Sequence, residues 1–241
     1  MFFLRSRAVL PAIALVIAAT GMWPESAADT GAPQLSSTQI VQQLQLRNKE
    51  RTEGLKQYKA LRHYQVEYQG FSTTVTATMD VEITYSATTG KSFEIVSQSG
   101  SKFLCEKVLK RAVDSEKEAS QDRESTALTT ANYRFQLAGS ESVGGRPAYI
   151  LDVEPLTASK FLYRGKIWVD AADFAVAKIE TQPAKNPSFW ISRTLIHGTS
   201  VKTDGFWLPQ TVRSETKVRV GGTAVMTIDY GTYQIRPNAP R

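Results

Sequence analysis

Few residues in this chain have the types and spacing that catalysis requires. Ser99 and Lys102 have the S-x-x-K spacing of serine acyl-enzymes, but the S-D-N and K-T-G motifs that accompany it in that class are missing. A chain of this length contains about one such pair by chance. We favour the alternative in which Ser101 caps a helix that begins after it, because serine is a preferred residue at that position.

Metal binding and carboxylate chemistry find equally little support. His63 and His197 are the only histidines, and neither has a second ligand at the spacing of a zinc site. Asp170 and Asp173 flank two alanines, a pattern in which aspartate shapes a turn by accepting hydrogen bonds from nearby backbone. No nucleophile elbow and no glycine-rich phosphate loop occur. We therefore expect a protein that is not an enzyme, with no catalytic residue, metal site or cofactor.

The N-terminus has the features of a secretory signal peptide. Arg5 and Arg7 form a short basic region, residues 8–20 form an apolar core, and Ser26-Ala27-Ala28 supplies small residues for cleavage. An uncleaved membrane anchor is the alternative, since the apolar segment is almost long enough to span a bilayer. We predict a signal peptide over residues 1–28.

The rest of the chain, residues 29–241, is expected to form a single domain that is periplasmic and soluble after cleavage. Cleavage would remove two positive charges and one negative charge, so the formal net charge would fall from +6 to +5. The positive residues are scattered rather than arranged in a stripe with aromatic residues, which argues against nucleic-acid binding. Cys105 is the only cysteine, so the fold cannot depend on an internal disulfide.

A long helix is predicted at the start of this domain. Ser36 and Gln39 form a capping-box sequence, and apolar residues continue at helical spacing as far as Leu61. Gly54 weakens the helix without ending it. A second helix is predicted over residues 103–119, where the apolar period is again that of a helix.

The remaining segments alternate between apolar and polar residues, the period of strands with one buried face and one solvated face. Glycine-containing turns separate many of them, as in an antiparallel sheet. Two helices cover about half of such a sheet. Either the sheet closes on itself or its uncovered apolar face forms a lipid-sized cavity. The predicted strands are residues 64–69, 75–85, 91–97, 133–137, 148–153, 166–169, 174–181, 191–201, 208–220 and 223–235.

Five strand-and-turn motifs point to a known fold: Arg146–Pro155, Gly165–Asp170, Lys178–Glu180, Asp204–Pro209 and Ile228–Tyr233. With the order of elements, they resemble the bacterial outer-membrane lipoprotein carrier superfamily, which comprises LolA-like proteins with LolB-like and RseB-like relatives. The resemblance covers nearly all of residues 35–236. It implies an α+β fold, an open antiparallel half-barrel of about ten to eleven strands with two or more helices covering its concave face.

The resemblance also implies a function. We expect a monomeric, non-enzymatic, periplasmic carrier or sensor that binds lipid or the acyl chains of a lipoprotein. The alternative is an envelope-stress regulator that uses the same fold to bind an envelope membrane protein. Residues 86–91 lack the basic residue and proline that carriers place after the second strand, so no functional arginine is transferred.

Two groups of residues are expected to form the binding site. Lys91 and Arg164 are placed at the rim, where they would meet an anionic headgroup. The residues expected to line the hydrophobic cavity are Tyr64, Val66, Tyr68, Val81, Ile83, Phe135, Tyr149, Leu151 and Trp168.

Overall fold

The computed structural model describes residues 35–237 except 71, 187 and 220, so the predicted signal peptide lies outside the described residues. The helices in this range are α1 (Ser37–Gly54), α2 (Lys102–Leu104), the π-helical η1 (Cys105–Leu109), α3 (Lys110–Gln121) and α4 (Arg123–Thr126). Over these residues, no helix is both long and apolar enough to cross a bilayer.

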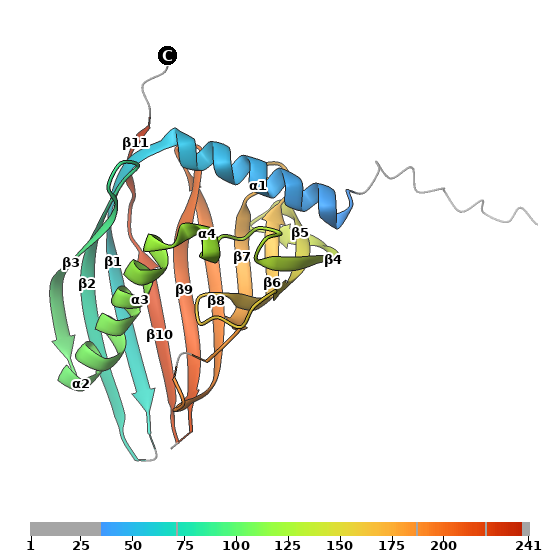
Figure 1. The fold of residues 1–241 in the computed structure, drawn as a ribbon. Coiled ribbons are helices and arrows are strands. Elements are labelled where there is room, and N and C mark those ends of the chain that lie inside the picture. The colour runs from blue at the N-terminus through green and yellow to red at the C-terminus, as the bar shows by residue number, and fades with distance from the viewer. Residues whose placement is uncertain (1–34, 71, 187, 220, 238–241) are drawn as a thin grey trace, which may run out of the picture. The chain divides into compact units, whose positions relative to one another are not determined.

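The strands form one antiparallel sheet (Figure 1). Its order is β3-β2-β1-β10-β9-β8-β7-β6-β5-β4, and β11 pairs with the first residues of β1. Because the path ends at β3 on one side and at β4 on the other, the sheet is open, and the predicted α+β half-barrel is confirmed. The strands are β1 (Leu55–Gln69), β2 (Thr74–Ser86), β3 (Gly90–Gly100), β4 (Tyr133–Val143), β5 (Arg146–Pro155), β6 (Tyr163–Asp170), β7 (Val176–Pro183), β8 (Ile191–Thr203), β9 (Phe206–Val218), β10 (Thr223–Tyr230) and β11 (Gln234–Pro237).

The helices cover one face of this sheet, which we call the inner face (Figure 1). Strand pairing places Ile167, Ile179, Gly198, Val212 and Ile228 in one row across β6 to β10. The two isoleucines at its β6 and β7 end belong to an apolar cluster that includes α1, whereas Val212 and Ile228 belong to a cluster that includes α2, η1 and α3. Two separate cores therefore share the inner face.

The predicted first helix is too long. Its capping box is confirmed, because Gln39 N donates to Ser36 Oγ and Ser36 N donates to Gln39 Oε1. However, α1 ends at Gly54, and the predicted helical segment up to Leu61 belongs to β1. Alternate residues of β1 are buried, and Arg62 is one of them. Because Arg62 is charged, the buried row of β1 is not uniformly apolar, and the alternation typical of a strand is interrupted in the sequence before Tyr64.

Glycine-containing turns at Gly144-Gly145, Asp204-Gly205 and Gly221-Gly222 join β4 to β5, β8 to β9 and β9 to β10, as expected for an antiparallel sheet. The last predicted strand, however, is divided in two, because β10 ends at Tyr230 and β11 begins at Gln234. Between β10 and β11, Gly231 N donates to the Leu61 carbonyl oxygen at 3.0 Å. This contact breaks the ladder and leads the chain alongside the start of β1.

Candidate functional site

The residues predicted to line one cavity lie in two separate cores. Most of them are fully buried by side-chain packing, so the inner face holds two packed cores in place of one open cavity. Tyr64, Val66, Tyr68, Val81 and Ile83 lie in the core beneath α2, η1 and α3, and Phe135, Tyr149 and Leu151 lie in the core beneath α1.

Trp168 belongs to neither core. Its neighbours Ile167 and Val169 lie in the core beneath α1, and successive residues of a strand point to opposite faces. Trp168 is therefore on the outer face, where Lys178 Nζ lies 4.1 Å from the centre of its ring. The expected lining row is displaced by one residue on β6, since Leu151 pairs directly with Ile167.

A helical segment from Lys102 to Gln121, comprising α2, η1 and α3, lies over β1, β2 and β3; we call it the covering helix. Ser101 Oγ accepts a hydrogen bond from Leu104 N at 3.4 Å, so the predicted cap is confirmed. Leu104 and Leu109 of its first half are buried against the sheet. Burying a leucine side chain fully contributes about 1.5–3 kcal/mol. Apolar packing therefore holds the first half in place.

Besides the buried Val113, charges hold the second half of the covering helix. Arg62 of β1 is only 1% exposed, and its Nη1 donates to Oε2 of Glu116 at 2.5 Å. Glu116 Oε1 accepts a hydrogen bond from Lys91 Nζ at 2.9 Å. The Arg62 guanidinium carbon also lies 4.4 Å from the centre of the Tyr230 ring. Arg62, Glu116 and Lys91 form what we call the ion triad. Lys91, expected to bind a headgroup, is thus engaged by the covering helix.

The ionisation of the triad follows from burial and mutual attraction. Burial alone would raise the pKa of Glu116, but the charges of Lys91 and Arg62 outweigh it and hold this pKa below its usual value. Burial would also lower the pKa of Arg62, and the charge of Glu116 reverses that effect and raises it. The pair is therefore ionised at neutral pH. Beside it, Arg62 Nε and the Tyr64 hydroxyl are buried without a hydrogen-bond partner among the described residues.

A hollow of about 430 Å³ lies beside the triad, and we call it the inner hollow. Its walls come from α1, α3 and α4, and Glu116 and Lys91 reach it from the triad. The rings of Tyr58 and Tyr85 stack on its floor with centroids 5.2 Å apart. Leu55 and Leu208 also contribute to the lining. The volume falls within the range of small-molecule sites, about 300–1,000 Å³, and the apolar floor suits a hydrocarbon chain.

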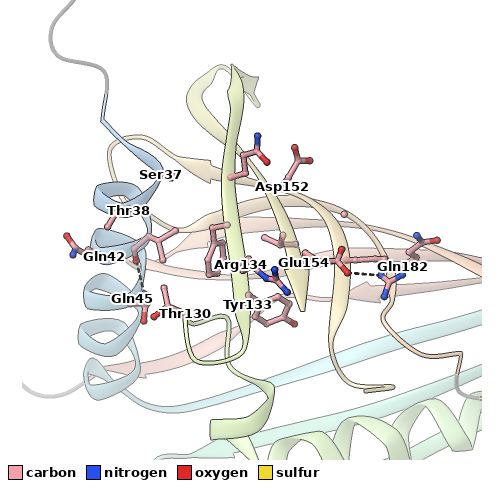
Figure 2. A pocket seen from close by; sticks show the side chains of 16 residues that line it. Ser37, Thr38, Gln42, Gln45, Thr130, Tyr133, Arg134, Asp152, Glu154 and Gln182 are labelled. Carbon is pink, nitrogen blue, oxygen red and sulfur yellow. Dashed lines mark hydrogen bonds and ion pairs between the residues drawn. The ribbon is translucent and has the colours of Figure 1, made fainter. Parts of the chain in front are cut away.

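A larger hollow of about 1200 Å³ lies at the edge strand β4 (Figure 2). Phe135, which packs against the core beneath α1, lines it, and Arg134 lines it as well. These two successive residues point to opposite faces of the strand, so the hollow wraps around the sheet edge. Arg164, expected to bind a headgroup, also lies here and pairs with Glu154 at 3.5 Å. This is an open, mixed groove, and it is less suited to an acyl chain than the inner hollow.

The residues first considered for catalysis have other contacts. Ser99 is a β3 residue whose carbonyl oxygen accepts from Cys105 Sγ at 3.5 Å. Asp170 Oδ1 accepts hydrogen bonds from the backbone N of Ala172 and of Asp173, which is the predicted turn geometry. Over the described residues, no three His, Cys, Asp or Glu side chains gather as metal ligands would.

The sequence prediction missed Arg62 and Glu116. One signal was present: Tyr58, Ala60, Tyr64 and Val66 share a period of two that places residue 62 on the same buried face. A charge at such a position requires a buried partner of opposite sign. No feature of the sequence identifies Glu116 as that partner among the charged residues of the covering helix.

No protein-family model and no curated protein sequence matches this chain. A solved DUF1329 family protein from Desulfovibrio piger is similar at 11% identity and a TM-score of 0.43, covering 86% of this chain and 96% of that chain. An outer membrane lipoprotein-sorting protein domain from Vibrio parahaemolyticus is similar at 14% and 0.40, covering 83% and 94%. A LolA superfamily protein from Nitrosomonas europaea is similar at 13% and 0.36, covering 86% and 96%. Sequence identities and TM-scores this low do not identify the function of this chain.

Proposed function

We propose that this protein is a non-enzymatic, periplasmic carrier or sensor that holds an acyl chain of a lipid or lipoprotein beneath the covering helix. The inner hollow carries the proposal. It combines an apolar floor on the sheet with a helix whose first half is packed and whose second half is fastened by the ion triad. Such a helix can lift at one end, and the hollow can lengthen, while the sheet stays folded.

The free energy of opening sets the size of the cargo. Lifting the second half of the covering helix exposes Val113, which opposes opening by about 1.5–3 kcal/mol. Separating Glu116 from Arg62 adds about 2–3 kcal/mol, since Glu116 keeps partial solvent exposure. Each acyl methylene that becomes buried contributes about 0.8 kcal/mol, so roughly five to eight methylenes offset the opening. Long acyl chains are therefore the expected cargo.

The triad also offers a place for the polar end of that cargo. Arg62 Nε and the Tyr64 hydroxyl are buried donors without partners among the described residues. An unpaired buried donor is destabilising, by about 1–3 kcal/mol. Neither residue lines the closed hollow, so a carbonyl oxygen of an acyl ester or amide would accept from them only once the covering helix has lifted. This match favours an acylated molecule over a plain hydrocarbon.

The test uses the protein comprising residues 29–241 and fills the inner hollow with a large side chain. Ala119 lines the hollow from α3, whereas Ser115 on the same helix is exposed. We expect A119W to weaken the binding of a long-chain lysophospholipid at least ten-fold, and S115W to leave it unchanged. Circular dichroism checks that both variants are folded. Native mass spectra of protein from a bacterial periplasm should show lipid on the wild type and S115W only. Equal lipid on all three would place the cargo elsewhere, and lipid on none would refute the carrier.

The second candidate is an envelope-stress regulator that binds the periplasmic part of a membrane protein. β3 is an edge strand on which Ile95 and Val96 are exposed, and residues 95–101 carry no charge. Such an edge is a template for the addition of a strand from another chain. A peptide that binds the lipid-free protein and is excluded by V96K would support this function, and a partner that binds V96K equally well would not.

A further inference from the structure

Two large aromatic side chains project from the loop between β7 and β8. Phe189 is 75% exposed and Trp190 is 56% exposed. Their rings contact each other edge to face, with centroids 5.5 Å apart. An isolated exposed apolar residue is ordinary, but two adjacent aromatic residues at a loop tip form a specific apolar surface.

Hydrogen bonds tie the backbone of the loop that carries these rings to its surroundings. Arg219 N, at the end of β9, donates to the Trp190 carbonyl oxygen at 2.8 Å. Asn186 Nδ2 donates to the carbonyl oxygens of Ile191 and Ser192 at 3.1 and 3.3 Å. The loop that carries the aromatic pair is therefore tied to its neighbouring strands, which reduces the backbone entropy lost when the pair binds.

Positive charge surrounds the pair. Arg193 and Lys217 lie directly opposite each other across β8 and β9, an arrangement that is destabilising because like charges repel. The Arg219 guanidinium carbon lies 5.2 Å from the centre of the Phe189 ring, and Lys185 is exposed on the same loop. Residues 181–203 and 216–228 contain no Asp or Glu. In the described part of the chain, none of these four basic residues forms an ion pair.

We propose that this basic aromatic tip, formed by Phe189, Trp190, Lys185, Arg193, Lys217 and Arg219, docks on the surface of an anionic lipid bilayer. Tryptophan prefers the interface between headgroups and acyl chains, and lysine and arginine bind anionic headgroups. The two rings expose on the order of 300 Å², well short of the roughly 800 Å² per partner of a stable protein interface. A bilayer needs no such complementary area.

The position of the tip suits this role. β1 starts directly after α1, beside the inner hollow. The last residue of β1, Gln69, pairs with Thr223 at the hairpin between β9 and β10, which lies next to the tip. The tip therefore lies at the opposite end of a 15-residue strand from the hollow. Docking at one end leaves the covering helix free at the other. The inference stands independently of the cargo, because its residues take no part in the inner hollow.

The experiment measures co-sedimentation of residues 29–241 with vesicles of phosphatidylcholine containing phosphatidylglycerol, and with vesicles of phosphatidylcholine alone. We expect binding to the anionic vesicles only, weakened by added salt. The paired change F189A/W190A should weaken it at least ten-fold. The paired change K217Q/R219Q should weaken it about twenty-five-fold, since each basic residue near such a surface contributes about 1 kcal/mol, or five-fold. As a matched control, L46A/K49Q alters an exposed leucine and an exposed lysine of α1 and should change nothing.

The fluorescence of Trp190 reports how deeply the tip enters the bilayer. Brominated lipids in the anionic vesicles should quench part of the tryptophan fluorescence of the wild type, and W190F should lose that part while still binding. Equal binding to neutral and anionic vesicles, or unchanged binding by both tip variants, would overturn the proposal. Dimers that form without lipid and dissociate in F189A/W190A would overturn it in favour of a second copy of the chain.

Discussion

Replacing Glu116 by glutamine removes one charge from the ion triad and leaves the shape of the covering helix unchanged. Arg62 would then be a buried cation without a counter-ion, in contact with the Tyr230 ring and a neutral amide. Breaking a buried ion pair on one side destabilises by about 3–5 kcal/mol, and the partial exposure of Glu116 reduces this to about 2–3 kcal/mol. Because the triad forms only when the helix lies on the sheet, most of this loss falls on the closed state.

That loss predicts a gain in binding. A shift of about 2 kcal/mol raises the population of the open state about thirty-fold, and apparent affinity rises in proportion while the open state is the minor one. E116Q should therefore bind the neutral apolar dye N-phenylnaphthylamine up to about thirty-fold more tightly than the wild type. Fluorescence titration measures the dissociation constant, and urea unfolding measures the loss of stability.

The matched control is E118Q, two residues further along α3. Glu118 pairs with Lys160 at 2.9 Å, but both side chains are largely exposed, and such a pair contributes about 0–1 kcal/mol. E118Q should change dye affinity less than five-fold. If E116Q lowers stability while dye affinity stays at the wild-type value, the covering helix is a fixed part of the core and the opening mechanism is wrong. Equal gains in both variants would show that general charge, and not the triad, governs opening.

The triad also predicts a pH dependence, and a glycine of β6 predicts a loss of stability. The pKa of Glu116 is lowered in the folded state, so ionised Glu116 stabilises the fold fully above its usual pKa of 4.5. This stabilisation is lost as the pH falls through the lowered pKa. The dye affinity of the wild type should rise as the pH falls across that window, and the affinity of E116Q should rise less. G165A should destabilise the fold by about 2–5 kcal/mol, because Gly165 has φ +138° and an added Cβ would press on the Glu180 carbonyl oxygen. The control G205A, at φ +83° with no atom within 4 Å, should lose only about 1–2 kcal/mol in thermal or urea unfolding.

The strands were predictable where one face of each is uniformly apolar. β2 is the clearest case, since its buried residues occupy every second position from Ala77 to Tyr85. The prediction failed at β1, where Arg62 replaces an apolar residue and conceals the period. It also failed at Trp168, because the sequence shows alternation but not which of two apolar rows faces inward. The partner of Arg62 was out of reach, since Glu116 is 54 residues away and pairing depends on how the covering helix crosses the sheet.

The division of the inner face explains why the cargo site is expected at only one end. Between the two cores, β7, β8 and β9 place Thr181, Thr194 and Ser214 on the inner face, all of them buried. Thr194 also hydrogen-bonds with Thr216 at 3.0 Å. An acyl chain that crossed these hydroxyls, which we call the hydroxyl belt, would separate Thr194 from Thr216, at about 1–3 kcal/mol for each one left unsatisfied. A chain beneath the covering helix therefore stops at the belt, while the core beneath α1 keeps the opposite half of the sheet folded. Replacing Thr194 and Thr216 together by valine should remove this barrier and extend the longest bound acyl chain by several methylenes in a lysophospholipid length series, and an unchanged length optimum would show that the belt does not limit the site.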